Sequence, residues 1–242
     1  MKDSLFNNPL DKLYDFEFND KVAEVFDNMI KRSVPFYEEV QNMTAQLTKK
    51  YYQKYSVIYD LGCSTANTII KLANHLKNKQ ISIIGIDSSI HMIALAKKKI
   101  AAHNLSNYKI EIFAKNIREV EPKESSVVIM NYTLQFIHPN QRKEILEKIF
   151  YHLLPKGILI LSEKIQNQND ELNQIYTKFY QDLKKKNGYS KLEIRQKRES
   201  LENVLIPYSE DKNITLLKEV GFRQIDTFFK WYNFLSLLAI KE

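Results

Sequence analysis

The stretch from Tyr55 to Ser64, YSVIYDLGCS, decides the fold of this 242-residue chain. Residues 55–61 are rich in β-branched and aromatic side chains, a composition that favours a buried strand. Gly62 follows directly and gives the backbone the freedom that a tight turn needs. Over 65–76 the apolar residues recur at helical spacing. The stretch therefore predicts a strand, a tight turn and a helix, in that order.

The same pattern of strand and helix repeats as far as residue 162. Each predicted strand is a continuous apolar run, which is typical of a parallel sheet covered on both faces. We therefore predict an α/β fold with a doubly wound, mostly parallel sheet. The predicted strands are 55–61, 81–86, 108–113, 127–132 and 158–162, and the predicted helices are 65–76, 88–100 and 139–153, the last ended by Lys156 and Gly157.

Two further segments, 20–50 and 165–213, lie outside this repeat and have helical patterns. The first is an N-terminal helical segment interrupted at Pro35, and the second is a helical insertion before the last two strands. Within the insertion, Ser190 and Glu193 form a capping box, which is a specific helix start. We expect seven strands in a single domain that spans the whole chain, 1–242. The remaining predicted elements are a helix over 214–220 and strands over 223–229 and 231–240.

The composition excludes several classes of protein. Cys63 is the one cysteine, so neither an intrachain disulfide nor a multi-cysteine metal site can form. No apolar run approaches the ~18 residues of a membrane span, and residues 1–20 lack the apolar region of a signal peptide. The five histidines show no metal-ligand spacing. We therefore expect a cytoplasmic protein with no metal site and no membrane contact.

The chain carries 36 basic and 29 acidic side chains, a formal net charge of +7. Such an excess can attract nucleic acid, yet the sequence is rich in Lys, Asn and Ile throughout, and this bias raises the lysine content without a functional reason. The run Lys184-Lys185-Lys186 fits the end of a helix, where the helix dipole favours cations. We interpret this run as a solvated surface and do not expect direct binding of nucleic acid.

Polar or small residues follow four of the predicted strands, at the edge where an open parallel sheet binds its ligands. They are Gly62, Asp87, Asn116 and Asn131. Gly62 lets the backbone pass close to a ligand, and Asp87 can accept two hydrogen bonds from a ribose diol. The loop after the first strand lacks the G-x-G-x-x-G pattern that wraps a pyrophosphate. The pattern thus favours an adenosine ligand over a dinucleotide.

Each of these residues also has a plain structural interpretation. Asp87 could cap the helix that follows it, and Gly62 could be an ordinary turn glycine. Tyr132 and Met29 read as packing residues rather than as ligand contacts. The combination of the turn after the first strand with an acid that ends the second strand is what favours a nucleoside site.

Several motifs carry a resemblance to a known superfamily. DLGCS at 60–64, the acid Asp87 and LLPKG at 153–157 resemble the class I S-adenosylmethionine-dependent methyltransferases. Longer stretches narrow the resemblance to the carboxy-S-adenosyl-L-methionine synthase family, over nearly the whole chain from about Leu5 to Ile240. These stretches are 26–37, 131–136, 161–164, 187–190 and 196–204.

The resemblance implies a reaction that the sheet alone does not indicate. Members of this family transfer a carboxylate derived from prephenate to the sulfonium methyl of S-adenosyl-L-methionine, which gives carboxy-S-adenosyl-L-methionine and phenylpyruvate. A tRNA carboxymethyltransferase then uses that product to form the 5-oxyacetic acid modification of wobble uridine. The family also forms homodimers, and apolar residues at Leu172, Ile175, Tyr176 and Phe179 fit such a contact.

The resemblance also implies the residues of the site. Arg198 matches the position that binds the transferred carboxylate, and we assign it the catalytic role. A planar guanidinium pairs with a carboxylate in a bidentate manner, whereas it would repel the sulfonium of an ordinary methyl donor. The implied contacts of S-adenosyl-L-methionine are Tyr37, Gly62, Cys63, Ser64, Asp87, Ser88, Asn116, Ile117, Asn131 and Arg198.

Three positions depart from the family pattern. Ala66 stands where glycine is usual, and alanine does not readily adopt a positive φ. Asn116 stands where aspartate is usual, although its amide oxygen can still accept from an adenine amino group. Ser88 replaces an asparagine. We expect these changes to affect affinity more than activity.

Two other functions stay open on the residues alone. One is an ordinary S-adenosylmethionine-dependent methyltransferase that acts on a small molecule or on tRNA. The other is a noncatalytic domain that binds adenosine or RNA. Asn131-Tyr132-Thr133-Leu134 is not the N-P-P-aromatic motif that cradles an exocyclic amine. The role of Arg198 is the feature that separates carboxyl transfer from methyl transfer.

Overall fold

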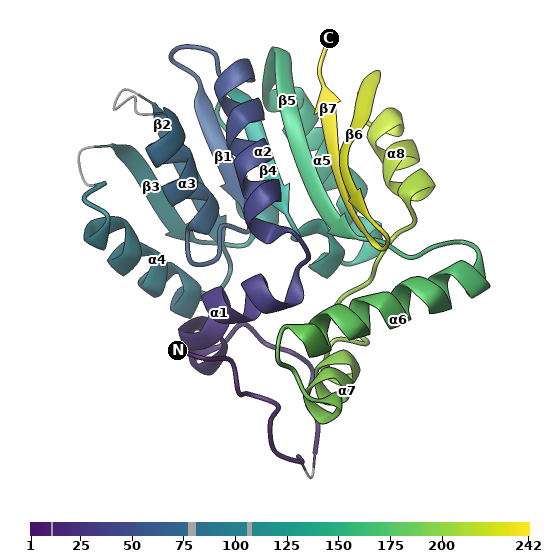
Figure 1. Cartoon of the computed structure of the whole chain (residues 1–242). Helices are drawn as coiled ribbons and strands as arrows, with labels where there is room; N and C mark the ends of the chain where they lie inside the picture. The colour runs from purple at the N-terminus through teal and green to yellow at the C-terminus, as the bar shows by residue number, and fades with distance from the viewer. Residues whose placement is uncertain (11, 77–80, 106–107) are drawn as a thin grey trace.

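The computed structural model describes residues 1–10, 12–76, 81–105 and 108–242 (Figure 1). Its centre is a seven-stranded sheet with the strand order β3-β2-β1-β4-β5-β7-β6. Strands β1 to β5 pair in parallel, and β7 pairs antiparallel with both β5 and β6. This confirms the predicted doubly wound, mostly parallel sheet. The strands are β1 Val57–Leu61, β2 Ser82–Asp87, β3 Lys109–Ala114, β4 Ser125–Asn131, β5 Leu153–Lys164, β6 Gln224–Trp231 and β7 Phe234–Ile240.

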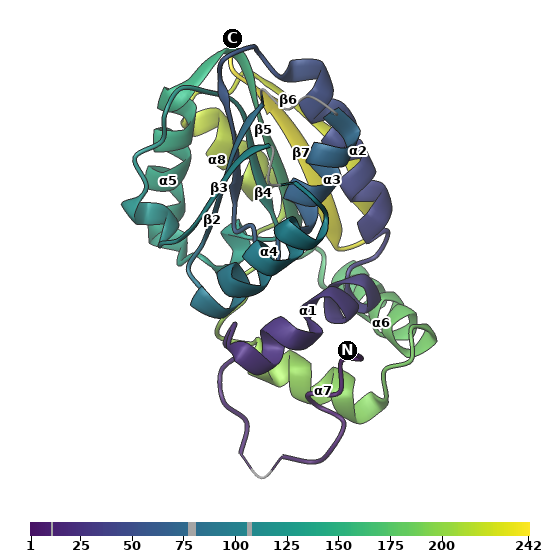
Figure 2. The ribbon, with the colours of Figure 1, turned by 90° about the vertical axis from the view of Figure 1, so that its left-hand side faces the viewer.

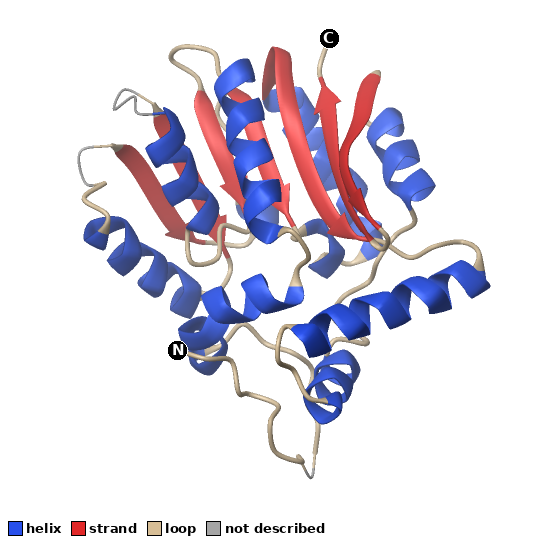
Figure 3. Cartoon of the chain, viewed as in Figure 1, coloured by secondary structure: helices blue, strands red, loops and turns tan. Residues whose placement is uncertain are grey.

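Helices cover both faces of the sheet (Figures 2 and 3). Two apolar cores result: α5 and α8 pack on one face, and α2, α3 and α4 pack on the other. β1 is buried along its whole length because it lies between these two cores. The helices are α1 Asp20–Ser33, α2 Tyr37–Tyr51, α3 Asn67–Leu76, α4 Ile90–Ala102, α5 Pro139–His152, α6 Asp170–Lys186, α7 Lys191–Ser200 and α8 Glu210–Glu219, with short 3-10 turns η1 Ile117–Glu119 and η2 Leu134–Phe136.

The helices α1, α6 and α7 form a separate layer across the carboxyl ends of the parallel strands (Figure 1). The N-terminal segment and the insertion meet there although they lie far apart in the sequence. Arg32 Nε donates to the carbonyl of Asn187 at 2.8 Å, and Asn187 Nδ2 donates to the carbonyl of Arg32 at 3.0 Å. Residues 1–10 cross α7, where the Gln196 amide donates to the carbonyls of Phe6 and Asn8. This layer closes the edge of the sheet at which ligands bind.

The first four predicted strands agree with the structure to within two residues at each end. The helix predicted over 139–153 is α5, which ends one residue earlier at His152, and the predicted start of the fifth strand at 158 is wrong because β5 already begins at Leu153. Leu153 pairs with Ser125 of β4, and Lys156, at φ 63°, donates its amide to the carbonyl of Lys241. Lys156 and Gly157 therefore lie inside a long strand rather than after a helix.

Two later boundaries also differ from the prediction. Trp231 ends β6 rather than beginning β7, since the hairpin turns at Tyr232 with φ 46°. α8 begins at Glu210 instead of residue 214, because the side chain of Ser209 caps it by accepting from the amide of Lys212. Among the described residues, no helix is both long and apolar enough to cross a membrane.

Candidate functional site

A cavity of about 520 Å³ lies between the carboxyl edge of the sheet and the layer of α1, α6 and α7. The loop after β1 and the ends of β2, β4 and β5 form its floor, and the helical layer contributes its roof. Phe16 and Phe18 from the segment before α1 also line it. A pocket of this size is within the range that binds nucleoside-sized ligands.

Gly62 places the loop after β1 in contact with the end of β4. Its φ is +82°, and a Cβ added there would lie 2.1 Å from Oγ1 of Thr133. The amides of Gly62 and Cys63 both donate to the carbonyl of Ile86, at 2.7 and 2.9 Å. Only glycine fits this position, because its backbone passes close to the Thr133 side chain, and the predicted close approach to a ligand stays a prediction. Burial raises the pKa of the Cys63 thiol well above its usual value, as expected for an inert cysteine.

The Asp87 carboxylate is oriented by two backbone amides. Ser64 N donates to its Oδ2 and Ser89 N donates to its Oδ1, both at 2.9 Å. Burial raises the pKa of Asp87, and the two amide hydrogen bonds oppose that shift. Ser89, whose hydroxyl accepts from the amide of Met92, is the helix cap, so the interpretation of Asp87 as the cap is wrong. Each carboxylate oxygen keeps a lone pair for one hydroxyl of a ribose diol.

Three residues other than glycine adopt left-handed backbone conformations around the cavity. They are Ser64 at φ 49°, Ala66 at φ 63° and Tyr132 at φ 58°. The expectation that Ala66 does not adopt a positive φ is therefore wrong, because the loop imposes that conformation and places Ala66 N within 2.8 Å of the Cys63 carbonyl. Strain of this kind gathers at functional sites, where the surrounding fold holds it.

Buried polar atoms at the ends of β1 and β4 lack partners among the described residues. Both amide atoms of Asn131, the hydroxyl of Tyr132 and Oδ2 of Asp60 are in this state. Burial and the nearby charge of Asp87 raise the pKa of Asp60 to about 7. Buried polar groups in native proteins nearly always have partners, and Asn131 and Tyr132 line the cavity. The unpartnered atoms of Asn131 and Tyr132 fit a polar ligand in the cavity that supplies the missing hydrogen bonds.

A polar network centred on Asp27, which we call the polar lock, holds α1 against the loop that follows β1. Asp27 Oδ1 accepts from the Thr65 hydroxyl at 2.6 Å and from the Asn67 amide at 2.9 Å. Lys99 Nζ lies 2.7 Å from Asp27 Oδ2. Burial acts to raise the pKa of Asp27, but these hydrogen bonds and the Lys99 charge lower it overall. The lock couples the helical roof to the floor of the cavity.

The structure brings together nine of the ten residues implied by the resemblance. Asn116 and Ser88 lie at the exposed rim, where Asn116 Oδ1 accepts from the amide of Arg118 at 3.0 Å. The nine that line the cavity are Tyr37, Gly62, Cys63, Ser64, Asp87, Ser88, Asn116, Ile117 and Asn131.

Arg198 is the tenth residue, and it is exposed on α7 outside the cavity lining. Helical periodicity explains this position. The buried face of α7 carries Gln196, Lys197 and Ser200, whereas Arg195 and Arg198 share the opposite, exposed face. Its neighbour in the sequence, Lys197, is buried and lines the cavity.

Sequence reasoning missed a group of lysines that the structure places in the cavity: Lys164, Lys184 and Lys197. The interpretation of the run 184–186 as solvated is wrong for Lys184, which is buried, and agrees with the structure for Lys185 and Lys186. The i, i+4 spacing of Tyr180 and Lys184 on α6 is the signal that could have revealed an inward face. Tyr132 and Met29 are buried as predicted, and both also line the cavity.

Comparison with known proteins places the chain among methyltransferase relatives. Residues 58–157 match the family model described as a methyltransferase domain. The chain is 45% identical to carboxy-S-adenosyl-L-methionine synthase from Desulfotalea psychrophila, with 99% of this chain and 97% of that protein covered. It is also 45% identical to the protein of the same name from Campylobacter jejuni subsp. jejuni serotype O:23/36, with 100% of both chains covered.

Solved structures share the fold at low sequence identity. An O-methyltransferase family protein from Burkholderia thailandensis matches with a TM-score of 0.69 at 15% identity, over 93% of this chain and 60% of that chain. Human N-acetylserotonin methyltransferase, solved in complex with S-adenosylmethionine, matches with a TM-score of 0.62 at 14% identity, over 91% of this chain and 55% of that chain. The sheet and its flanking helices thus form the class I methyltransferase fold.

Proposed function

The chain belongs to the carboxy-S-adenosyl-L-methionine synthase family of enzymes, and on that premise we propose that it converts S-adenosyl-L-methionine and prephenate to carboxy-S-adenosyl-L-methionine and phenylpyruvate. The observation that carries the proposal is the cradle of Gly62, Asp87 and Asn131 at one edge of the sheet. The glycine at Gly62 keeps the backbone free of a side chain beneath the nucleoside of S-adenosyl-L-methionine, the oriented carboxylate of Asp87 matches its ribose, and the unpartnered amide of Asn131 matches its amino-acid part.

The nine residues of the cavity divide between the parts of S-adenosyl-L-methionine. Asp87 accepts from the ribose hydroxyls, and Asn116 with Ile117 contacts the adenine at the rim. Tyr37 and Asn131 bind the methionine portion. The loop formed by Gly62, Cys63 and Ser64 passes beneath the nucleoside, and Ser88 lies beside the ribose. In support, all of these residues line one continuous cavity.

The proposed reaction balances when water is released. The sulfonium methyl loses a proton, which leaves a transient ylide, and forms a carbon–carbon bond to the transferred carboxyl carbon. Prephenate loses its ring carboxylate and its ring hydroxyl, and its ring becomes the aromatic ring of phenylpyruvate. The hydroxide and the methyl proton combine as water, so no oxidant or reductant is needed.

Arg198 is proposed to hold the transferred carboxylate. Its exposed guanidinium lies one residue from the cavity-lining Lys197, so this role requires the side chain to turn toward the cavity when the carboxylated product forms. The test compares Arg198→Ala with Arg195→Ala, which removes an arginine from the same exposed face. Arg198→Ala should keep S-adenosyl-L-methionine binding and fail to accumulate the carboxylated nucleoside, which mass analysis detects. Accumulation of the carboxylated nucleoside at the wild-type level in Arg198→Ala would remove the role assigned to Arg198.

The product is proposed to act as a carboxymethyl donor. A tRNA carboxymethyltransferase would take it up to form 5-oxyacetic acid at wobble uridine, which places the reaction in the cytoplasm. Support comes from the chemistry of the product, because a carboxymethyl group on a sulfonium is activated for transfer to a hydroxyl oxygen. Incubation of the reaction mixture with that partner enzyme and tRNA, followed by nucleoside analysis, tests this step.

A further inference from the structure

Three lysines from three different elements enter the cavity on its β5 side. Lys164 ends β5, Lys184 lies on α6 and Lys197 lies on α7, and all three line the cavity. Lys184 and Lys197 are each 7% exposed. Lysine is almost never buried to this degree without a partner, because removing an ammonium group from water is costly. Two such groups, with the half-buried Lys164 in the same cavity wall, therefore need an explanation.

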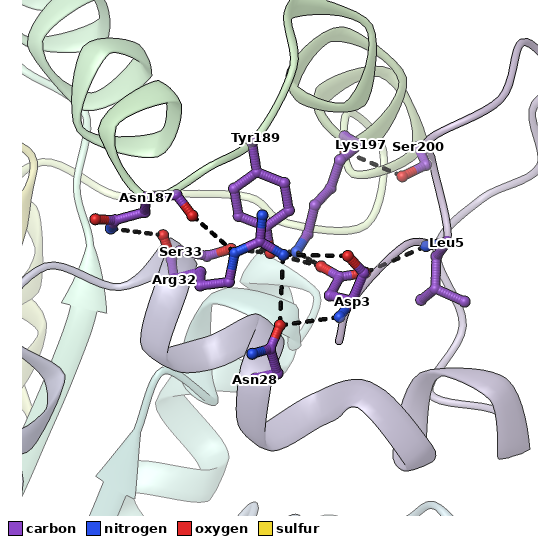
Figure 4. A network of polar contacts seen from close by, with 9 residues as sticks. All are labelled: Asp3, Leu5, Asn28, Arg32, Ser33, Asn187, Tyr189, Lys197 and Ser200. Atoms are coloured by element: carbon purple, nitrogen blue, oxygen red, sulfur yellow. Dashed lines mark hydrogen bonds and ion pairs between the residues drawn. The ribbon is translucent and has the colours of Figure 1, made fainter. Parts of the chain in front are cut away.

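The carboxylates near these lysines do not balance their positive charge. Asp3 Oδ2 lies 3.8 Å from Lys197 Nζ, but the same oxygen accepts a hydrogen bond from Tyr189 at 2.5 Å (Figure 4). Ser33 Oγ accepts from Lys197 Nζ at 3.3 Å. Within the described part of the chain, no carboxylate forms an ion pair with Lys164 or Lys184.

Aromatic rings take the place of acidic partners. The ammonium groups of Lys184 and Lys164 lie 4.4 and 5.5 Å from the centre of the Tyr180 ring. Lys197 Nζ lies 5.6 Å from the centre of the Tyr189 ring. A ring face attracts a cation without occupying its N–H donors in directed hydrogen bonds. The donors of Lys164 and Lys184 thus remain available to a ligand in the cavity.

The charge of this cluster matches an organic dianion. Three lysines and Asp3 sum to 3 − 1 = +2, and the two further charged groups that face Lys197, Arg32 and Glu193, have opposite signs. Burial, together with the charges of the neighbouring lysines, lowers the pKa of Lys184 well below its usual value. A bound dianion would remove this repulsion.

The lysine cluster also lies apart from the adenosine end of the site. The sheet order β2-β1-β4-β5 places Asp87 and Gly62 on one side of Asn131 and places Lys164 on the other. A nucleoside held by Asp87 and Gly62 therefore has its reacting sulfonium end near Asn131. The space beyond it, toward β5, α6 and α7, is where a second substrate must lie.

We propose that Lys164, Lys184 and Lys197 form an anion subsite that binds both carboxylates of the dicarboxylate donor. This inference rests on the proposed function, because it assigns the second substrate of that reaction to a place in the cavity. The competing source of a carboxylate is the methionine end of S-adenosyl-L-methionine itself. The two sources differ in which ligand loses affinity when a lysine is removed.

The test is calorimetric titration of prephenate into the full chain saturated with S-adenosylhomocysteine. Lys164→Met and Lys184→Met should each weaken prephenate binding by about 10- to 100-fold, the effect of one charge-assisted hydrogen bond. The matched control is Lys186→Met, which removes an exposed lysine from the same helix and should leave the affinity unchanged. Phenylpyruvate, with one carboxylate, should bind more weakly than prephenate to the wild type.

Measuring the affinity of each variant for both S-adenosylhomocysteine and prephenate separates the possible outcomes. S-adenosylhomocysteine should bind both variants within about twofold of wild type, because its contacts lie on the other side of Asn131. An equal loss of affinity for S-adenosylhomocysteine and prephenate overturns the proposal in favour of the methionine carboxylate, and unchanged prephenate affinity overturns it outright. Lysine-dependent prephenate binding without product formation supports the subsite while contradicting the proposed function. Because methionine removes a buried charge, both variants should unfold at or above the wild-type temperature, which checks that they fold.

Discussion

Asp87 combines two tasks at the residue scale, since it orders the loop after β1 and presents its free lone pairs to the ligand. Replacing it by alanine removes two ribose hydrogen bonds of about 1.5 to 3 kcal/mol each, before compensation by water. We expect Asp87→Ala to weaken S-adenosylhomocysteine binding by at least about tenfold in calorimetry. Asp87→Asn keeps one acceptor oxygen, so its affinity for S-adenosylhomocysteine should lie between those of wild type and Asp87→Ala. Wild-type affinity in the alanine variant would contradict the placement of the ribose.

Ala66 carries backbone strain that can be measured. Its φ of 63° is unfavourable for alanine by about 1 to 2 kcal/mol relative to an unstrained residue, and glycine adopts that conformation freely. Ala73, which is also buried, lies within the regular part of α3 and is the matched control. In urea denaturation, Ala66→Gly should lose about 1 to 2 kcal/mol less stability than Ala73→Gly. Equal losses would show that the loop is not strained at this position.

At the scale of elements, the charged groups that α1, α6, α7 and the N-terminal segment bring around Lys197 make the free energy of unfolding depend on pH. Burial lowers the pKa of Lys197 from 10.5 to about 8, a shift that Arg32 supports and that Asp3 and Glu193 oppose, while Lys184 faces the same wall from α6. Between pH 8 and 10.5 the unfolded chain then binds more protons than the folded chain. The free energy of unfolding of the unliganded protein should therefore rise with pH in this window.

Lys197→Met isolates this contribution. A single lysine accounts for at most about 1.4 kcal/mol per pH unit, which is the linkage slope for one proton. We expect the rise in unfolding free energy between pH 8 and 10 to be smaller in Lys197→Met than in wild type, with the exposed Lys186→Met as control. Parallel curves for wild type and Lys197→Met would contradict the lowered pKa. Prephenate affinity should fall over the same window, because the dianion binds the protonated lysine.

Local sequence patterns predicted the helices and strands well. The way in which the helices pack onto the sheet was harder to predict. The capping box of Ser190 and Glu193 is present because it depends only on neighbouring backbone groups. The floor of the site followed from the sequence too, since Gly62 and Asp87 come directly after strands whose apolar pattern is unmistakable. The inward position of Lys184 depends instead on how α6 docks onto the sheet, and the i, i+4 spacing of Tyr180 and Lys184 is the local signal that accompanies it.

Arg198 is the converse case, since the resemblance predicts it inside the cavity and the structure places it outside. A family resemblance assigns a role to a sequence position, but the side on which a helix faces a cavity is set by tertiary packing. α7 buries Ile194, Gln196 and Lys197, and this leaves Arg198 outside. The start of β5 was missed for a related reason, because the pairing of Leu153 with Ser125 is a contact between strands that the sequence of either alone does not reveal.

At the scale of the whole molecule, α6 presents an apolar face that the sheet does not cover. Leu172, Ile175 and Phe179 are between 37% and 41% exposed, and Tyr232, whose ring centre lies 5.0 Å from that of Phe179, extends the face at 39% exposure. We propose that a second copy of the chain covers it, as a homodimer. In sedimentation at micromolar concentration, wild type should be a dimer and Ile175→Glu should shift toward monomer. The exposed Gln174→Glu is the control, and a wild-type monomer would contradict the proposal.

The central claim, transfer of a carboxyl group from prephenate to the sulfonium methyl, has one most direct measurement. The full chain is incubated with S-adenosyl-L-methionine and prephenate labelled with ¹³C in its ring carboxylate, and the nucleoside product is analysed by mass spectrometry with fragmentation. The predicted result is a carboxylated nucleoside whose label lies in the carboxyl group on the former methyl carbon, formed together with phenylpyruvate. Recovery of unlabelled S-adenosyl-L-methionine alone, or of S-adenosylhomocysteine with a methylated acceptor, would contradict the claim.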